Sequence, residues 1–97
     1  MYISVICPTY NSSAFIYKTI ESILDQTYCK FEIIFSDDGS TDKTINILEN
    51  FKIRFEEKKI LVKIIKNHHK GPGFARNEAI KVANYEWIAF IDSDDLW

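Results

Sequence analysis

Several features that mark whole classes of protein are scarce or missing in this sequence of 97 residues. Its two cysteines, Cys7 in an apolar run and Cys29 in a polar connection, form neither a disulfide framework nor a metal-binding spacing. The formal net charge of -2 provides no basic field for phosphates, so general nucleic-acid binding is disfavoured. No apolar run approaches the roughly 20 residues of a membrane span, and none forms the core of a signal peptide. These absences predict a cytoplasmic protein with reduced cysteines.

What is present is the composition of an ordinary globular domain. Hydrophobic residues make up 46% of the chain and charged residues 27%, as in soluble proteins. A chain of this length forms at most one domain, with enough buried surface for one core. No internal repeat, low-complexity stretch or linker interrupts it. The order of the predicted elements is therefore the main evidence on its fold.

Two hydrophobic periodicities alternate along the chain. Short β-branched runs predict strands at residues 2–7, 31–36, 60–65 and 86–91, and apolar residues at helical spacing predict three helices between them. The first helix is expected to start at a cap among residues 11–13, the second at Ser40 or Thr41, and the third after residues 71–73. The order β-α-β-α-β-α-β with short connections predicts an α/β fold, a three-layer α/β/α arrangement around an open, mainly parallel sheet.

The chain ends directly after the fourth predicted strand, with Leu96 and Trp97 as its last residues. A strand in that position without a covering helix exposes an apolar edge, which natural domains usually protect. This edge predicts that the sequence is part of a longer protein. It also predicts self-association of the isolated chain through the exposed strand.

The unusual polar residues gather where the predicted strands end, in segments 8–11, 37–40, 67–70 and 92–95. Ligands of open parallel sheets bind beyond the carboxyl ends of the strands, so these segments are expected to share one rim. Two of the segments contain five aspartates, and on neighbouring strand ends their charges would repel unless a cation lay between them. Oxygen ligands favour magnesium or manganese, with water and substrate phosphates completing the coordination. The rim therefore predicts a metal-bound diphosphate.

Each of these features also has a plain structural explanation. Asp-Asp-Gly-Ser is a common turn before a helix cap, and a lone D-x-D pair is common on surfaces. Tyr10 is either a half-buried loop aromatic or a ring that stacks on a nucleobase. Arg76, in the first turn of the third predicted helix, opposes the helix dipole unless a phosphate binds there. His68 and His69 lack a metal-ligand spacing and are expected to be ordinary loop residues. The joint placement of the acids at strand ends favours the functional interpretation.

The same residues form five motifs that resemble those of the family 2 glycosyltransferases, which have the GT-A fold. In chain order the motifs are VICPTYN at 5–11, SILDQT at 22–27, SDDGSTD at 36–42, ARN within 71–77, and FIDSDD at 90–95. They cover essentially the whole chain, and five motifs in the right order make the resemblance specific at family level. The resemblance implies that residues 1–97 are the N-terminal, nucleotide-sugar-binding part of a catalytic domain, the Rossmann-like half of a GT-A fold.

By this resemblance, the donor is a nucleoside-diphosphate sugar, often uridine-linked, and the acceptor is a saccharide or a lipid-linked molecule. Asp38 would hydrogen-bond the base, since uracil offers an N–H donor. Asp92 would lie near the ribose, while Asp94 and Asp95 would hold Mn²⁺ or Mg²⁺. The residues that the resemblance assigns to the donor nucleotide are Pro8, Thr9, Tyr10, Asn11, Asp37, Asp38, Arg76, Asp92 and Ser93.

Transfer in this family usually inverts the anomeric carbon by direct displacement, with a carboxylate base that deprotonates the acceptor hydroxyl. That base lies beyond the D-x-D motif in the family, so no residue of 1–97 is assigned as catalytic. The chain alone is expected to bind the donor without efficient transfer. A role in bacterial surface-polymer assembly, in the cytoplasm or at the inner face of the cell membrane, is a family-level expectation.

Three other classes of protein have some of the same sequence features. A receiver domain would need its acidic pair after the first strand, where Thr9, Tyr10 and Asn11 stand. A nucleotidyltransferase would need a glycine-rich, basic phosphate loop at the same place, which the sequence lacks. A nucleotide-binding module without catalysis stays open as a description of these 97 residues alone.

Overall fold

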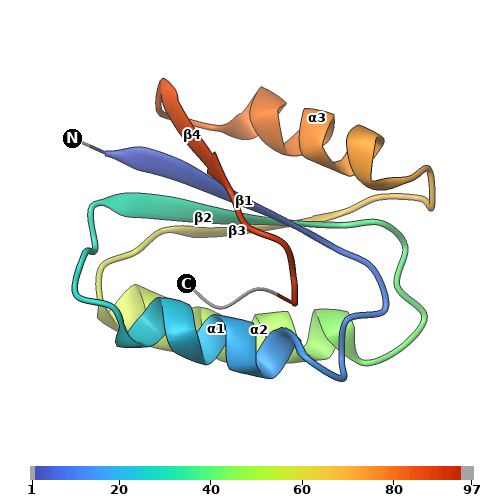
Figure 1. Ribbon diagram of the computed structural model, residues 1–97, viewed down its shortest axis with the longest axis horizontal. Helices are drawn as coiled ribbons and strands as arrows, with labels where there is room; N and C mark the ends of the chain where they lie inside the picture. Colours follow the sequence, from blue (N-terminus) through green and yellow to red (C-terminus); the bar gives the residue numbers. More distant parts are fainter. Residues whose placement is uncertain (1, 95–97) are drawn as a thin grey trace.

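The computed structural model of the chain describes residues 2–94 and confirms the predicted three-layer α/β fold. The elements are β1 (Ile3–Thr9), α1 (Ile16–Asp25), β2 (Phe31–Asp37), α2 (Thr44–Glu57), β3 (Val62–Lys66), α3 (Pro72–Val82) and β4 (Trp87–Phe90). The strands pair in parallel in the order β3-β2-β1-β4. Figure 1 shows α3 on one face of the sheet and α1 and α2 on the other.

β1 and β2 form the centre of the sheet. Every residue of β2 is buried, and the register places Val5 beside Ile33 and Ile6 beside Ile34. Successive side chains of a strand point to opposite faces, so a strand covered on both faces needs apolar residues at nearly every position. This requirement explains the unbroken apolar runs in the sequence.

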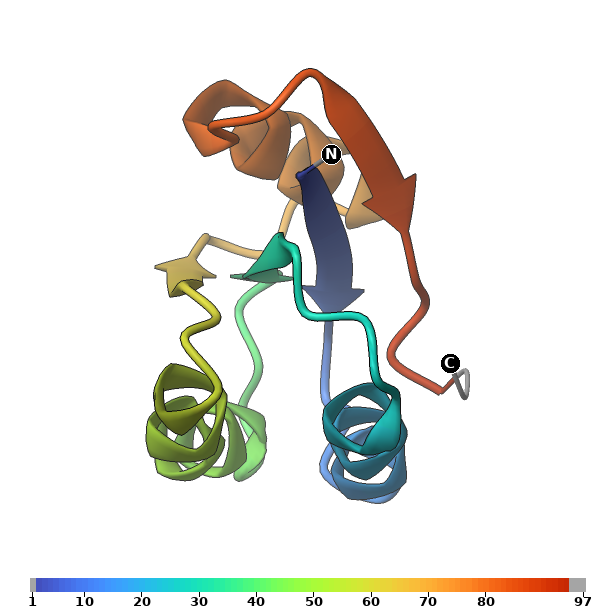
Figure 2. The same ribbon diagram turned by 90° about the vertical axis from the view of Figure 1, so that its left-hand side faces the viewer.

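The two faces of the sheet carry cores of different size. The larger core lies against the paired helices α1 and α2, which stand side by side beneath the sheet in Figure 2 and bury Ile20, Leu48 and Phe55. The smaller core lies under α3, where Ala75 and Ala79 are fully buried. Small side chains let this helix approach the central strands closely. None of the helices that the structure describes is both long enough and apolar enough to cross a membrane.

The predicted starts of the first two helices were wrong. α1 begins at Ile16 and α2 at Thr44, and neither helix has a side-chain cap. Two hydroxyl groups expected to cap helices are used in the loops instead. The Ser12 hydroxyl bonds to Tyr10 and Ser93, and the Ser40 hydroxyl donates to Asp37. The loops before both helices are longer than predicted because their polar side chains hold the strand ends together.

The strand order also corrects the expectation that the two acidic segments follow neighbouring strands. β1 lies between β2 and β4, and β4 is an edge strand that pairs only with β1 among residues 2–94. Trp87 and Phe90 of β4 are 63% and 54% exposed. Self-association through this edge stays a prediction.

A buried carboxylate joins the strands near their amino ends, far from the predicted rim. Glu32 is 1% exposed and accepts hydrogen bonds from the Ser4 hydroxyl at 2.6 Å and from Asn84, through its backbone N–H at 2.6 Å and its amide at 3.1 Å. The Lys63 ammonium lies 3.4 Å away. Burial by itself would raise the pKa of Glu32, but the hydrogen bonds and the Lys63 charge together outweigh burial and lower it.

Candidate functional site

The loops that follow the carboxyl ends of β1 and β2 are tied to each other by Asn11. Its backbone lies in the left-handed region, with φ 46°, and its N–H donates to the Ser40 hydroxyl at 2.8 Å. Its side-chain oxygen accepts the backbone N–H of Thr41 at 2.8 Å and that of Asp42 at 3.3 Å. Asparagine tolerates this conformation better than most residues. Asn11 therefore shapes the rim rather than presenting a free side chain to it.

Asp37 lies beneath the rim and joins the same two strands. Its carboxylate is 1% exposed and accepts the Thr9 hydroxyl at 2.6 Å, the Ser40 hydroxyl at 2.6 Å and the Ser40 N–H at 2.7 Å. Bonds to an ionised acceptor are stronger than those between neutral groups. Asp37 thus fixes the position of Thr9, which lines the hollow above it.

Asp38, the next residue, joins β2 to the loop before α3. It is 3% exposed, and its carboxylate accepts the backbone N–H groups of Lys70 at 2.8 Å and Gly71 at 3.0 Å. The His69 ring nitrogen Nδ1 lies 2.9 Å from the same carboxylate. Gly39 packs so closely here that a Cβ would come within 2.9 Å of the His69 backbone nitrogen, and its φ is +79°. The turn after β2 and the loop after β3 therefore form one rigid unit.

A hollow of about 290 Å³ opens at this edge of the sheet. It is lined by Pro8, Thr9, Tyr10, Asp38, His69, Pro72 and Ser93. Tyr10 is 45% exposed, and its ring stacks on that of His69 with a centroid distance of 4.3 Å and an interplanar angle of 25°. Six of the lining residues, all but Pro72, come from the four segments predicted to share one rim, so the expected convergence at the carboxyl ends is present.

The D-x-D segment reaches the hollow through Ser93. The Ser12 hydroxyl donates to the Ser93 hydroxyl at 3.0 Å, and Thr19 of α1 donates to the Ser93 carbonyl at 2.7 Å. Asp92 and Asp94 on either side are exposed, and the Arg76 guanidinium lies 3.9 Å from Asp92. An exposed ion pair at this distance contributes little to stability. Asp95 lies outside the described residues.

The expectation that five crowded aspartates require a cation was wrong in its premise. Asp37 and Asp38 are buried and stabilised by hydrogen bonds, and β1 separates their strand from β4. Within residues 2–94 no group of three His, Cys, Asp or Glu side chains is arranged to hold a metal ion. The assignment of Asp94 and Asp95 to a metal stays a prediction, because magnesium and manganese commonly bind one or two carboxylates and take their other ligands from water and phosphates.

Reasoning from the sequence missed two residues of this region. His69 was expected to be an ordinary loop residue, yet it contacts both Tyr10 and Asp38. Its place at the carboxyl end of β3 was the available signal.

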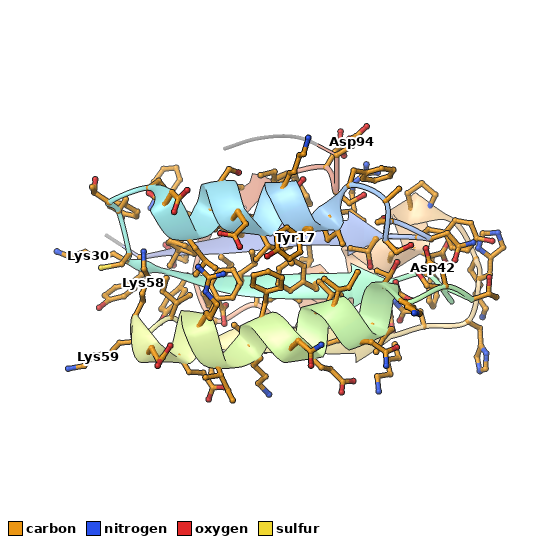
Figure 3. All side chains as sticks on the ribbon, turned by 90° about the horizontal axis from the view of Figure 1, so that it is seen from below. Tyr17, Lys30, Asp42, Lys58, Lys59 and Asp94 are labelled. Atoms are coloured by element: carbon orange, nitrogen blue, oxygen red, sulfur yellow. The ribbon has the colours of Figure 1, made fainter. Side chains whose placement is uncertain are left out.

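Asp42 was not singled out as a residue with its own role. Burial would raise the pKa of Asp42, but hydrogen bonds donated by Thr44 and Ser13 outweigh burial and lower the pKa to about 2. Figure 3 shows Asp42 at the opposite end of the molecule from Lys30, Lys58 and Lys59.

Two further hollows lie elsewhere. One of about 330 Å³ lies between α1 and α2 and is lined by Tyr17, Ile47, Asn50, Phe51 and Arg54. The other, of about 370 Å³, lies near the amino end of β2 and is lined by Ile23, Asp25, Gln26, Thr27, Tyr28, Cys29, Lys58 and Ile60. Neither is lined by residues from the carboxyl ends of the strands, where open parallel sheets bind ligands.

The sheet and its rim define an α/β protein with a hollow beyond the carboxyl ends of parallel strands, where open sheets of this kind bind ligands. The family model for glycosyl transferase family 2 matches residues 4–97. The chain belongs to this family, which confirms the resemblance seen in its motifs.

Relatives with named activities match nearly the whole chain. It is 45% identical over 95 residues to the Escherichia coli UDP-Glc:alpha-D-GlcNAc-diphosphoundecaprenol beta-1,3-glucosyltransferase WfaP, covering 98% of this chain and 36% of that protein. It is 41% identical over 97 residues to the poly(ribitol-phosphate) beta-glucosyltransferase of Bacillus spizizenii, covering 98% and 15%. The chain thus spans about a third or less of the length of these relatives.

Solved structures show the same fold. The crystal structure of S. aureus TarS 1-349 in complex with UDP-GlcNAc matches with a TM-score of 0.84 and 38% identity, over 99% of this chain and 27% of that chain. The mannosyltransferase PcManGT from Pyrobaculum calidifontis, in complex with GDP-Man and Mn²⁺, matches with a TM-score of 0.88 and 28% identity, over 98% and 28%. These neighbours confirm the expected GT-A type of α/β fold.

Proposed function

We propose that residues 1–97 bind the nucleotide of a nucleoside-diphosphate sugar, and that the whole protein transfers the sugar to an acceptor hydroxyl. The observation that carries this proposal is the hollow that brings Tyr10, Asp38 and Ser93 together from three separate motifs. The complexes of TarS with UDP and with UDP-GlcNAc support a uridine-linked donor. The GDP-Man complex of PcManGT makes guanosine the base to test against it.

In this proposal the base lies between Tyr10 and Asp38. The exposed Tyr10 ring offers a face for stacking, and Asp38 is an acceptor for the ring N–H of uracil. Pro8 and Thr9 form the wall of the hollow, while Asp37 and Asn11 hold the strand ends in place without contacting the base directly. The specificity then depends on one stacking surface and one buried acceptor.

The diphosphate is proposed to lie near Asp92, Asp94 and Arg76. Asp94, with Asp92 or the adjacent Asp95, would hold Mn²⁺ or Mg²⁺, which when bound neutralises charge on the departing diphosphate. Arg76, close to Asp92, places a second positive charge at the same side of the rim. Positive charge placed in advance where negative charge develops lowers the barrier to transfer.

The remaining parts of the reaction are proposed for the longer protein. Direct displacement with inversion needs a base at the acceptor hydroxyl, and we assign none within residues 1–97. The acceptor is proposed to be a saccharide or a lipid-linked molecule, as the name of WfaP indicates for that relative. A lipid-linked acceptor would place the reaction in the cytoplasm at the inner face of the cell membrane.

Calorimetric titration of the chain with UDP and with GDP, each with and without Mn²⁺, tests the proposal. We expect UDP to bind more tightly, and Mn²⁺ to strengthen its binding. Tyr10→Ala should weaken UDP binding about tenfold, since stacking on an aromatic ring contributes about 1–3 kcal/mol per base.

Tyr17→Ala is the matched control for this titration. Tyr17 is 55% exposed on α1 and lies outside the rim, so its removal should leave UDP binding unchanged. Equal losses in both variants would contradict the assigned site, and a folded chain that binds neither nucleotide would contradict the proposed function.

A further inference from the structure

His69 occupies the place where the proposed function puts the base. Its ring stacks on Tyr10 at 4.3 Å with an interplanar angle of 25°. Its Nδ1 lies 2.9 Å from the carboxylate and 3.1 Å from the backbone carbonyl of Asp38. Carboxylate and carbonyl oxygens can only accept hydrogen bonds, so Nδ1 must carry the hydrogen. The imidazole is therefore a flat ring that stacks on Tyr10 and donates a ring N–H to Asp38.

These are the two contacts that a pyrimidine base would make with the same residues. We infer that His69 is an internal competitor: its side chain fills the base position in the free chain and leaves when a nucleotide binds. The inference rests on the proposed function and adds a device that sets the affinity of the site. Because one Tyr10 face and one carboxylate cannot serve two rings in the same place, imidazole and base exclude each other.

The surroundings of His69 allow its side chain to leave while its backbone stays. The side chain is 60% exposed, so a rotation carries it into solvent. The backbone is fixed, because the next two N–H groups, of Lys70 and Gly71, donate to Asp38 and because Gly39 packs against the His69 nitrogen. Displacement is therefore a side-chain rotation and requires no opening of the loop.

The hydrogen bonds of Asp38 also permit the exchange. When the imidazole leaves, the carboxylate keeps its bonds from Lys70 and Gly71 and regains one free acceptor position. A buried carboxylate with a free lone pair next to an exposed aromatic face is suited to a ring N–H. The same two residues thus hold either ring in turn.

Removing the competitor should raise nucleotide affinity. A site that is available in only a fraction of molecules shows an affinity reduced by that fraction. We expect His69→Ala to bind UDP roughly three to ten times more tightly than the unaltered chain. His68→Ala is the matched control, because His68 is the adjacent, exposed histidine, and we expect it to leave the affinity unchanged.

Three measurements on the chain test the inference: calorimetry with UDP, proton NMR of the His69 ring, and thermal unfolding to verify that each variant folds. In the free chain the Tyr10 ring current should shift the His69 ring protons upfield, and saturating UDP should remove that shift. Free imidazole should weaken UDP binding to His69→Ala by occupying the vacated position, with a smaller effect on the unaltered chain.

The possible outcomes separate this inference from the function on which it rests. Tighter UDP binding by His69→Ala, together with loss of the upfield shift, supports the competitor. UDP binding that is unchanged or weaker in His69→Ala overturns it while leaving the proposed function intact, since His69 would then be a bystander or part of the binding wall. Failure of both the unaltered chain and His69→Ala to bind UDP overturns the proposed function and the competitor together.

Discussion

Removal of the buried Glu32 carboxylate should strongly destabilise the fold without touching the rim. Glu32 accepts bonds from Ser4 and from two groups of Asn84, and it faces the Lys63 ammonium at 3.4 Å. In Glu32→Ala the buried Ser4 hydroxyl loses its acceptor, at about 1–3 kcal/mol, whereas the exposed Asn84 can turn its donors to water. Breaking a buried charge network typically costs about 3–5 kcal/mol, and we expect a loss of that size.

The change can be followed by urea unfolding, with Glu32→Gln as the matched variant. Gln keeps one acceptor oxygen but turns an N–H₂ group toward its neighbours, so we expect an intermediate loss of about 1–3 kcal/mol. Because the free energy of unfolding of a domain is about 5–15 kcal/mol, the Ala variant should be either folded at low temperature or only marginally stable. A loss below about 1 kcal/mol in Glu32→Ala would refute the reasoning.

The pH dependence of unfolding provides a second test of the same network. The pKa of Glu32 is lowered in the folded chain below its ordinary value of 4.5. A lowered folded pKa means that the carboxylate stabilises the fold above pH 4.5, and that this contribution is lost as the pH falls through the folded pKa. Glu32→Gln should therefore lose less stability than the unaltered chain on acidification below pH 4.5. If the stability of the two proteins changed with pH in parallel, ionisation of Glu32 would make no contribution to the pH dependence of folding.

Three further predictions concern the rim. Gly39→Ala should destabilise the chain by about 1–3 kcal/mol in urea unfolding, and by more than Gly71→Ala does. Both glycines have positive φ, but only at Gly39 would an added Cβ meet backbone atoms. Equal losses in the two variants would contradict the close packing at Gly39. The pKa of Asp42 is lowered from 3.8 to about 2, so its ionised carboxylate stabilises the fold above pH 4 and this contribution is lost as the pH falls from 4 to 2. Asp42→Asn should therefore lose less stability than the unaltered chain over that range. An unchanged acid profile would argue against the bonds from Thr44 and Ser13. Asp94→Asn should remove the Mn²⁺ dependence of UDP binding in calorimetry while leaving metal-free binding unchanged, and a retained Mn²⁺ effect would place the ion elsewhere.

The sequence was sufficient to predict the element order, the parallel sheet and the rim. Those features follow from local patterns: β-branched runs for β1 and β2, helical spacing around Ile20 and Leu48, and polar residues at strand ends. Helix starts were less predictable, because Ser12 and Ser40 are good caps in isolation but bond across loops in the fold. A choice between local and distant partners depends on tertiary structure, which no local pattern reports.

In the candidate site, too, some features could be predicted from the sequence and others could not. The positions of Tyr10, Asp38 and Ser93 around one hollow were expected, while the burial of Asp37 and Asp38 was not. An aspartate with satisfied hydrogen bonds and one that awaits a cation look identical in a sequence. The contact of His69 with Tyr10 depends on the exact path of the loop after β3, which spacing does not determine.

The hydroxyl of Ser12 and that of Ser93 are 81 positions apart in the chain, yet they are 3.0 Å apart in space. This contact cannot form before residue 93 has been added to the chain, and closing so long a loop costs entropy. During synthesis the hollow therefore cannot be complete until β4 has joined β1. Under the proposed function, nucleotide binding would require β4 to be in place, so a binding assay would report that this last strand has been added to the sheet.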